Sequence, residues 1–397
     1  MNFKQDFPML SKTTYFDSCA TTLKPRCVIE KMTDYYENYC ANAHRGDYDI
    51  SKKVDAEFEE TRDKTAKFIN AFSSKEIIFT SGATESLNLA ISGFFTSYLK
   101  PGDEIVTTKA EHASLILPWF EVAKKTGAII KYVDLESDLI VTFNNVKKAV
   151  TSKTKVISLA HITNVIGDVR PIKEISSFAH KQGILMVVDG AQSVPHKKVD
   201  VNDLDVDFYA FSAHKMLGPT GVGVLYGKEK YLEKVKPLNV GGGMNAFFDS
   251  KMNTEYKELP YKLEAGTPNI AGVIGFSKAI DYINELGIEN IYSYEVSLKK
   301  YMVEKLEKLK NVVIYNKNIK NGIITFNVDG VFSQDVAAYL NKKNICVRVG
   351  NHCAKTLSEV LGVSNTCRVS LYFYNTKEDV DKLIDALDNE NILYDSL

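Results

Sequence analysis

The stretch Ile184-Leu-Met-Val-Val-Asp-Gly-Ala-Gln192 decides the fold class of this chain. An unbroken apolar run precedes Asp189, which is typical of a strand buried on both faces of a parallel sheet. Because short apolar runs separated by helix-length segments require crossover connections, we predict an α/β fold with a mostly parallel sheet. The other runs of this kind are Ile77–Thr80, Glu104–Thr107, Ile129–Val133, Val156–Leu159 and Phe208–Phe211.

Polar residues follow several of these predicted strands. In open α/β sheets ligands bind at the carboxyl ends of the strands, so these residues are candidates for a functional site. They are Ser81–Thr84, Glu111–His112, His161–Asn164, Asp189–Gln192 and Ser212–Lys215.

The C-terminal part of the chain has a different pattern. A long charged segment at 291–309 has apolar residues three and four apart, which predicts a helix. We expect Gly322–Val328 and Ile345–Val349 to be strands, and Lys377–Leu387 to be a closing helix. The chain is therefore expected to form a large domain at 15–280 and a smaller α+β domain at 281–397, which the segment 1–14 completes.

The composition is that of an ordinary globular protein, with 45% hydrophobic and 25% charged residues. Its 49 basic and 50 acidic residues give a net charge of -1, which provides no general attraction for nucleic acid or a membrane surface. No signal peptide is expected, and no segment has the roughly 20 apolar residues of a membrane span. The six cysteines form no CxxC pair, so we expect no metal site, no disulfide framework and a cytoplasmic location.

Lys215 follows an apolar run, and we expect its ammonium group to be partly removed from water. Desolvation lowers the pKa of a lysine and makes the amine nucleophilic toward a carbonyl carbon. Most lysines are instead solvated surface charges, and an aspartate before Gly190 often only caps a turn. Asp189 nevertheless favours a reactive lysine, because a carboxylate at a strand end suits the ring nitrogen of pyridoxal phosphate, whose protonated ring accepts electrons.

Pyridoxal phosphate also needs a site for its phosphate group. Ser81-Gly-Ala-Thr84 opens a predicted helix and offers a hydroxyl and free backbone N–H groups, including that of Ala83, at the positive end of a helix dipole. Ser212 and His214 can add two donors. Many turns of this kind only cap a helix, but beside a reactive lysine this one predicts a pyridoxal-phosphate site.

Eleven short motifs extend this pattern over nearly the whole chain. In chain order they are Tyr15–Pro25, His44–Gly46, Phe79–Glu85, Glu111–Ser114, Asn164–Gly167, Val188–Gln192, Phe211–Gly221, Gly241–Met244, Glu264–Asn269, Arg348–Ala354 and Cys367–Ser370. In this order they resemble the fold-type I pyridoxal-phosphate enzymes of the class V aminotransferase family, and most of all the class II (SufS-type) cysteine desulfurases. The resemblance implies a large domain with a mostly parallel seven-stranded sheet and a smaller α+β C-terminal domain.

The resemblance also implies roles for the candidate residues. Lys215, Cys353 and His112 would be the catalytic residues, with Lys215 holding the cofactor as a Schiff base and Cys353 taking the sulfur. Thr267 would reach the phosphate of the partner subunit, which implies a homodimer. The remaining cofactor contacts would be His112 stacked on the ring, Asp189 at the ring nitrogen, Gln192 at the phenolic oxygen, and Ala83, Thr84, Ser212 and His214 at the phosphate.

Arg368 and Asn164 are implied to bind the substrate carboxylate, for which a planar guanidinium group is well suited. An arginine in an exposed ion pair is the alternative. Arg348 would help to position the substrate or keep the thiolate charged. Cys353 follows His352, whose imidazole would raise the thiolate fraction, although a lone cysteine is more often a buried structural residue.

The implied reaction converts L-cysteine to L-alanine and leaves a persulfide on Cys353. The sulfur would pass to an acceptor protein (SufE-like or SufU-like) for iron–sulfur cluster or thio-cofactor assembly. Only a short segment with a helix-like stretch at 357–361 separates Cys353 from Arg368, so we expect the thiol to be tethered near the substrate. A selenocysteine lyase, a cysteine sulfinate desulfinase and a non-catalytic sulfur-delivery scaffold are the alternatives.

The chain departs from the family pattern at two places. Cys19 stands where the family commonly has alanine, which puts a second thiol near the expected site. Acidic residues, Asp47 and Asp49, follow the His44–Gly46 motif. We assign no role to Cys19, and the acidic residues affect only the expected shape of the entrance.

Overall fold

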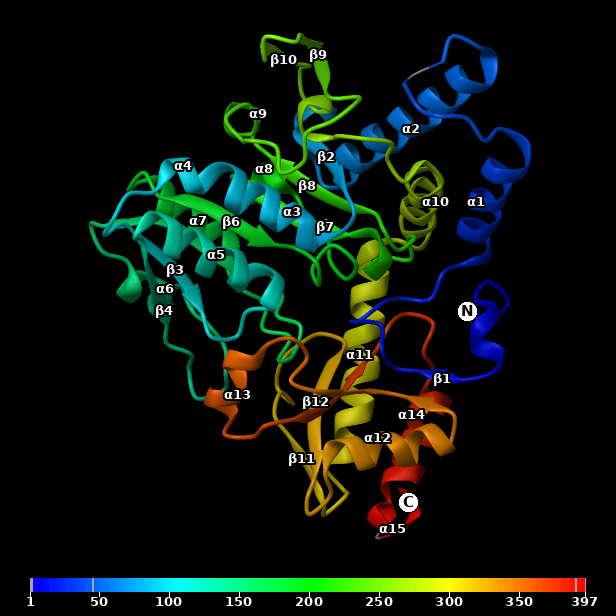
Figure 1. Cartoon of the computed structure of the whole chain (residues 1–397). Coiled ribbons are helices and arrows are strands. Elements are labelled where there is room, and N and C mark those ends of the chain that lie inside the picture. Colours follow the sequence, from blue (N-terminus) through cyan, green and yellow to red (C-terminus); the bar gives the residue numbers. More distant parts are fainter. Residues whose placement is uncertain (1–2, 45, 390, 397) are drawn as a thin grey trace.

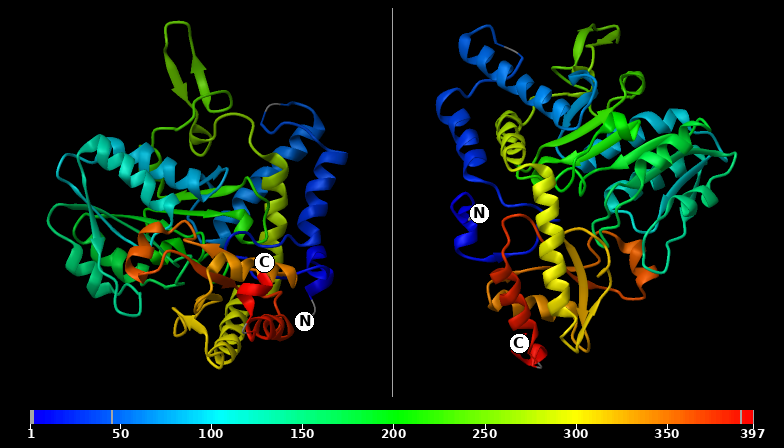
Figure 2. Two further views of the ribbon diagram at one scale, coloured as in Figure 1. Left: turned by 60° about the horizontal axis from the view of Figure 1, so that its bottom comes forward. Right: turned by 180° about the vertical axis from the view of Figure 1, so that it is seen from behind.

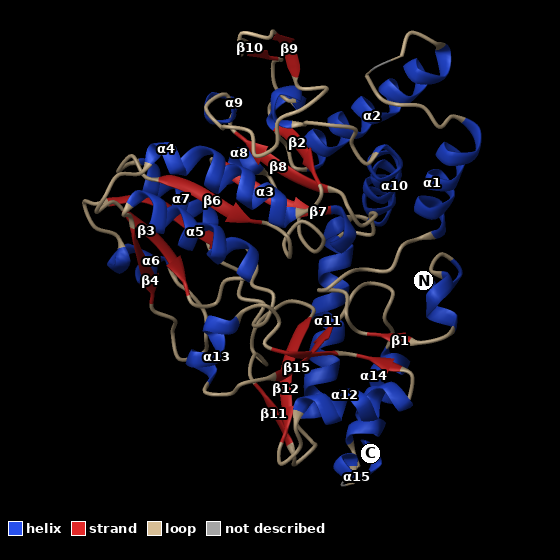
Figure 3. Ribbon diagram, viewed as in Figure 1, coloured by secondary structure: helices blue, strands red, loops and turns tan. Residues whose placement is uncertain are grey.

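The central feature of the computed structural model is a seven-stranded sheet with helices on both faces (Figure 1, Figure 3). The structure describes residues 3–44, 46–389 and 391–396. Neighbouring strands are parallel except at β8, which is antiparallel to both neighbours, so the predicted mostly parallel seven-stranded sheet is confirmed. In spatial order the strands are β2 (Ile77–Thr80), β8 (Gly223–Gly227), β7 (Phe208–Ser212), β6 (Leu185–Asp189), β5 (Thr154–Ala160), β3 (Glu104–Thr108) and β4 (Ile129–Val133).

The central strands of this sheet are buried on both faces, whereas the edge strand β4 is mostly exposed. Side chains alternate between the two faces along each strand. In β6, Leu185 and Val187 pack into one apolar cluster, whereas Met186 and Val188 pack into the other. These side chains are at most 5% exposed. Full burial of an apolar side chain stabilises the fold by about 1.5–3 kcal/mol. A strand that is buried on both faces therefore requires a continuous apolar run in the sequence.

Helices supply the apolar groups that cover the two faces. On one face lie α3 (Ala83–Ala90), α5 (Ala113–Thr126) and α9 (Glu229–Leu232), with the short α4 (Thr96–Tyr98) beside α5. The other cluster includes α6 (Phe143–Ala149), α7 (Ile172–His180), α8 (Val201–Leu204), α1 (Arg26–Asn38), α2 (Asp49–Phe68) and α10 (Ile270–Leu286). A hairpin of β9 (Asn245–Phe248) and β10 (Thr254–Tyr256) projects from the body, at the top of the left view in Figure 2.

Strand β8 was not located from the sequence. It reads Gly223-Val-Leu-Tyr-Gly227, so glycines bound a short apolar segment and hide it among turn residues. Gly223 lies against the turn that begins α3, where an added Cβ would stand 2.3 Å from the Cα of Gly82. Only glycine therefore allows β8 to approach this turn.

The C-terminal part is built along α11 (Ile288–Leu306), the long yellow helix in Figure 1, so the helix predicted at 291–309 is displaced toward the N-terminus. An antiparallel sheet packs beside it, and helix α14 (Lys377–Leu387) has the predicted bounds. The sheet order is β11 (Val312–Ile314), β12 (Ile323–Val328), β15 (Thr366–Ser370) and β14 (Arg348–Gly350). The other helices here are α12 (Ser333–Lys342), α13 (Lys355–Leu361) and α15 (Ile392–Ser396).

The single strand predicted at Ile345–Val349 was wrong. The chain forms β13 (Ile345–Cys346), which pairs in parallel with β1 (Thr14–Tyr15), and then β14, which joins the four-stranded sheet. An apolar run indicates an extended segment but not its pairing partner, and here the partner changes at Val347. The β1–β13 pair ties the N-terminal segment to the C-terminal part, while the domain boundary at 280 stays a prediction.

Helix lengths also bear on the relation of the chain to membranes. Within the part of the chain that the structure describes, no helix has both the length and the apolar character needed to cross a bilayer.

Candidate active site

A cavity of about 220 Å³ lies at the carboxyl ends of the central strands, where the sequence placed the functional residues. It is lined by residues of the large sheet and of the C-terminal part together. Most of the predicted residues meet here: Ala83, Thr84, His112, Asn164, Asp189, Ser212, His214, Lys215, Arg348, Cys353 and Arg368. Cys19, Ala20, Ser114, Ala191 and His352 line it as well.

Lys215 ends the short helical turn that follows β7. Burial lowers the pKa of its amine, while the nearby Asp189 carboxylate acts in the opposite direction. Among the described residues, none forms a hydrogen bond or ion pair with the Lys215 ammonium group. The amine therefore projects into the cavity as a group that loses its proton easily and is free to react.

Asp189 is the last residue of β6 and stands deep in the same cavity. Its Oδ1 accepts a hydrogen bond from the Ala191 backbone N–H at 2.9 Å, which fixes the carboxyl group. Burial raises its pKa, and the charge of Lys215 counteracts the rise. A carboxylate held in this way can pair with a cationic ring nitrogen.

Polar groups gather at the turn before α3, where the sequence predicts a phosphate site. The Ala83 N–H donates to Ser212 Oγ at 2.7 Å, and the Thr84 and Ser114 hydroxyls are 2.7 Å apart. Ser114 was part of a quoted motif but received no role from the sequence. Because glycines let β8 approach this turn closely, hydroxyl and N–H donors gather at the positive end of α3 without a side chain between them.

His112 caps the start of α5, and its Nδ1 accepts a hydrogen bond from the Ser114 N–H at 3.1 Å. This contact leaves Nε2 as the protonated nitrogen. Burial, with the charges of Lys215 and Arg368, lowers the pKa of His112 to about 4. The ring is therefore neutral at ordinary pH, as a group that stacks on a cofactor ring should be.

Arg368 is buried and reaches the cavity from β15. It donates from Nη1 to the Asn164 backbone oxygen at 2.9 Å and from Nη2 to Asp17 Oδ1 at 3.3 Å. Its Nε and the side-chain oxygen of Asn164 are buried without a hydrogen-bond partner. The alternative of an exposed ion pair is therefore excluded for Arg368, and the pair retains polar atoms that a ligand carboxylate and ammonium group can satisfy.

Asp17 contacts two residues of the candidate site, although sequence reasoning assigned it no role. Its carboxylate lies 3.3 Å from Arg368 Nη2 and 3.8 Å from Arg348 Nη1, so it links the two predicted arginines. Burial raises the pKa of Asp17, and the two guanidinium groups pull it down. The only sequence signal was its place in the Tyr15–Pro25 motif.

Cys353 is exposed, which excludes the alternative of a buried structural cysteine. It lies with His352 in a left-handed turn (φ 58° and 52°) just before α13. The help expected from the His352 imidazole is absent, because its Nε2 contacts Thr366 and burial lowers its pKa to about 3. A neutral ring held at Thr366 cannot supply the charge that stabilises a thiolate.

Two predicted residues do not line this cavity. Gln192 donates from Nε2 to the Cys19 oxygen at 2.9 Å, and its Oε1 is buried without a partner. Thr267 lines a separate cavity of about 590 Å³ together with His44 and Ser81. The role expected for Thr267 in a partner subunit stays a prediction, and Arg45 of the quoted motif lies outside the described residues.

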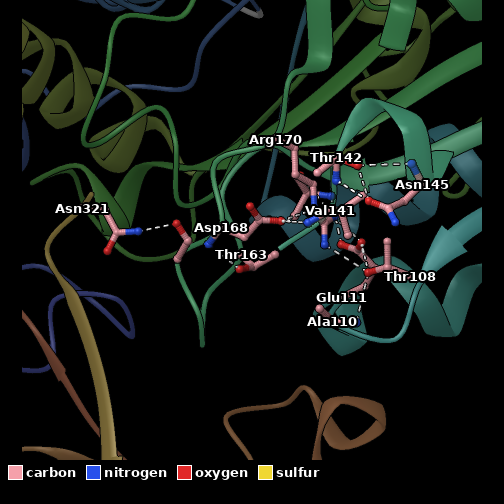
Figure 4. A network of polar contacts seen from close by, with 12 residues as sticks. Thr108, Ala110, Glu111, Val141, Thr142, Asn145, Thr163, Asp168, Arg170 and Asn321 are labelled. Carbon is pink, nitrogen blue, oxygen red and sulfur yellow. Dashed lines mark hydrogen bonds and ion pairs between the residues drawn. The ribbon is translucent and has the colours of Figure 1, made fainter. Parts of the chain in front are cut away.

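A buried ion network surrounds Arg170 (Figure 4). Arg170 contacts Glu111 through Nη1 and Asp168 through Nε, the latter at 3.3 Å, and donates to Thr108 Oγ1 at 3.0 Å. Glu111 directly precedes His112, and its Oε2 accepts from the backbone at the end of β5. Arg170 was not found from the sequence, because its partners Glu111 and Thr108 come from a distant segment.

We expect Arg170→Met to destabilise the protein strongly, because Glu111 and Asp168 would remain buried without a cation. Breaking such a pair costs about 3–5 kcal/mol, and urea unfolding measures the loss in the free energy of unfolding. Lys173→Met is the matched control, since Lys173 pairs with Asp203 on the exposed surface. Equal stability of the two variants would contradict the structural importance of this network.

The residues around the cavity fit pyridoxal phosphate. One cavity contains the Lys215 amine without a partner, the fixed Asp189 carboxylate and the neutral His112 imidazole. It also contains the donor-lined turn before α3, which an added Cβ would fill. With the mostly parallel seven-stranded sheet, this donor set defines a fold-type I pyridoxal-phosphate enzyme.

Known proteins of similar sequence and structure agree with this class. The pattern of the aminotransferase class-V family matches residues 14–383. A probable cysteine desulfurase of Halalkalibacterium halodurans is 44% identical over 391 residues, which cover 97% of this chain and 96% of that protein. The crystal structure of the cysteine desulfurase CsdA (S-sulfonic acid) from Escherichia coli is 36% identical with a TM-score of 0.92, covering 97% of this chain and 96% of its own.

A third relative extends the similarity. The apo structure of a cysteine desulfurase from Thermococcus onnurineus NA1 is 37% identical with a TM-score of 0.93, over 97% of this chain and 96% of that one. The chain therefore belongs to the class-V aminotransferase family and, within it, to the pyridoxal-phosphate-dependent cysteine desulfurases.

Proposed function

We propose that this chain is a class II (SufS-type) cysteine desulfurase, which converts L-cysteine to L-alanine and carries the sulfur as a persulfide on Cys353. The observation that carries the proposal is that Lys215, Arg368 and the exposed Cys353 line one cavity. A reactive amine, a carboxylate-binding group and a thiol are the three groups that this reaction needs on the protein.

The cofactor, when bound, supplies an electron sink for the Cα of the substrate. Asp189 would hold the ring nitrogen, His112 the ring face and Gln192 the phenolic oxygen, while Lys215 would carry the cofactor through Nζ. The residues proposed for the phosphate are Ala83, Thr84, Ser212 and His214, with Thr267 of the partner subunit.

The residues of the chain then perform the remaining steps. Arg368 and Asn164 orient the substrate carboxylate, with Arg348 at the entrance. Lys215 removes the Cα proton as a neutral amine, which its lowered pKa favours. The Cys353 thiolate attacks the substrate sulfur, so that one S–S bond forms as the Cβ–S bond breaks. Cβ then takes up a proton, and the proton that Lys215 removed returns to Cα to give alanine.

The proposal extends to the assembly and the cell. The chain would work as a cytoplasmic homodimer whose active sites share the interface, and a SufE-like or SufU-like protein would accept the sulfur for iron–sulfur cluster or thio-cofactor assembly. We also retain the division into 15–280 and 281–397 with 1–14. Alanine release with and without a candidate acceptor, together with detection of a protein persulfide, tests the proposed function.

The same measurements separate the alternatives. A selenocysteine lyase or a cysteine sulfinate desulfinase would share every cofactor residue, so the three substrates must be compared at equal concentration. A clear preference for selenocysteine or cysteine sulfinate would overturn the cysteine desulfurase assignment. A sulfur-delivery scaffold without catalysis would be colourless after purification with added cofactor.

We expect Asp189→Asn to retain the cofactor but to lose rate by about 100-fold or more, because an unprotonated ring is a poor electron sink. The visible spectrum measures retention of the cofactor, and alanine release measures the rate. Ser193→Ala is a useful control, since Ser193 is buried near Asp189 without lining the cavity. Unchanged turnover of Asp189→Asn would remove the ring-nitrogen role.

A further inference from the structure

Four consecutive backbone carbonyls, those of Asn164, Val165, Ile166 and Gly167, each accept a hydrogen bond from a side chain of the C-terminal part. We call these four residues the carbonyl ladder. The donors are Arg368 Nη1 to Asn164 at 2.9 Å, Thr325 Oγ1 to Val165 at 2.5 Å, Asn316 Nδ2 to Ile166 at 2.8 Å, and Asn321 Nδ2 to Gly167. All four donor residues are buried, so water does not compete for these carbonyls.

Two of the donors, Asn316 and Asn321, are fixed by their own surroundings. Asn316 accepts from the Thr325 N–H at 2.9 Å and also donates to the Ile323 oxygen at 3.0 Å. Asn321 accepts from the Ile323 N–H at 2.7 Å. These contacts lock both amides in one orientation at the start of β12, so the donors are in place before any ligand binds.

The ladder is also held from the side of the large sheet. The Asp168 N–H donates to Thr163 Oγ1 at 3.0 Å, and Asp168 pairs with the buried Arg170. Figure 4 shows Asn321 reaching the loop from one side and Arg170 from the other. The Asn164 side chain in turn donates to the His352 oxygen at 2.8 Å, beside Cys353. The segment 164–168 is therefore held by both the large sheet and the C-terminal part.

We propose that Thr325, Asn316 and Asn321 are positioning residues for the substrate carboxylate. By fixing the ladder they fix Asn164 relative to Arg368, so the carboxylate site is formed before substrate arrives. This inference rests on the proposed function, in which Arg368 and Asn164 bind that carboxylate. Preformed sites bind more tightly because little ordering is left to occur on binding.

The test uses Thr325→Val in the cofactor-loaded enzyme, because valine keeps the shape and removes only the hydroxyl. We expect the KM for L-cysteine to rise about five- to tenfold, with kcat within about twofold of the parent. L-Alanine has a carboxylate but no thiol, and its affinity, measured by spectral titration, should fall by the same factor. Thr325→Ser restores the hydroxyl and should restore both values.

Tyr372→Phe is the matched control, since the Tyr372 hydroxyl donates to the Pro195 oxygen at 3.0 Å and does not contact the ladder. Both variants lose one buried hydroxyl, so both should lower the melting temperature. Only Thr325→Val should change the KM. An equal rise in KM for both variants would show a general structural effect and overturn the proposal.

Arg368→Lys separates this inference from the proposed function. If Thr325 acts through Arg368, adding Thr325→Val to Arg368→Lys should change the KM by less than about twofold, because effects on one shared interaction do not add. Fully additive effects would overturn the inference. An Arg368→Lys variant with a normal KM would overturn the proposed carboxylate site, whereas a silent Thr325→Val beside an impaired Arg368→Lys would overturn only the role of the ladder.

Discussion

Lys215→Ala is expected to give a protein that lacks the yellow absorbance of a lysine-linked cofactor and produces no alanine. Lys215 is the lysine that lines the cavity, and burial lowers the pKa of its amine. The variant loses both the attachment point and the base for the Cα proton, so we expect turnover to fall by at least about 10⁴-fold. Visible spectra and alanine release measure the two losses separately.

Lys24→Met is the matched control for this prediction. Burial lowers the pKa of Lys24 to about 7, but its ammonium group donates to the Thr22 and His214 backbone oxygens and does not line the cavity. A lowered pKa is therefore not sufficient for the role, which also requires the position of Lys215. We expect Lys24→Met to keep its colour. A Lys215→Ala protein with normal absorbance and alanine production would show that another lysine carries the cofactor.

The sequence was sufficient to predict the bounds of those strands whose own residues form a strand-like pattern. Ile77–Thr80 has the predicted bounds, since apolar or β-branched side chains are needed wherever a strand lies within a covered sheet. Ile129–Val133 also has the predicted bounds, although it is an edge strand with mostly exposed side chains, because its β-branched and aromatic residues favour a strand. Residues 345–349 failed for the opposite reason. Two short strands there pair with partners more than a dozen residues away in the chain, and local periodicity holds no information about which edge is open.

The same distinction explains the site. Asp189, Lys215 and Ser212 were found because each stands at a strand end, where a parallel sheet brings such residues together. Asp17 and Arg170 were missed because their importance lies in ion pairs between distant segments. The altered pKa of His352 was likewise invisible, since the sequence showed its neighbour Cys353 but not the contact with Thr366 that holds its ring.

The position of Cys353 leads to the second large effect, because its thiol is exposed while its backbone is anchored on both sides. Its oxygen accepts from the Ala113 N–H at 2.7 Å, at the head of α5, and β14 ends just before it. On the other side, Thr356 donates to the Lys109 oxygen at 2.7 Å and so holds α13 to the large sheet. The tether predicted from the sequence is therefore reinforced by contacts that span the chain.

A thiol held in this way is well placed to take sulfur from a substrate and poorly placed to carry it elsewhere. We therefore expect L-cysteine alone to give a burst of about one alanine per active site, followed by slow turnover, because the persulfide stays on Cys353. An acceptor that inserts its own thiol or a zinc-bound site into the cavity should restore fast turnover. Mass spectrometry after cysteine treatment should place the extra sulfur on Cys353.

Two variants decide where the sulfur resides. Cys353→Ser should keep the visible absorbance of the cofactor, because it leaves Lys215 intact, yet show neither burst nor persulfide. Cys19→Ala is the matched control: Cys19 lines the same cavity, but burial raises the pKa of its thiol and keeps it protonated, so its removal should leave the persulfide in place. Rapid multiple turnover without reductant or acceptor would show that the tether does not limit delivery. Extra sulfur mainly on Cys19 would show that Cys353 is not the carrier. Because Lys215 and the substrate site are unchanged in both variants, any difference between them reports on the thiol alone.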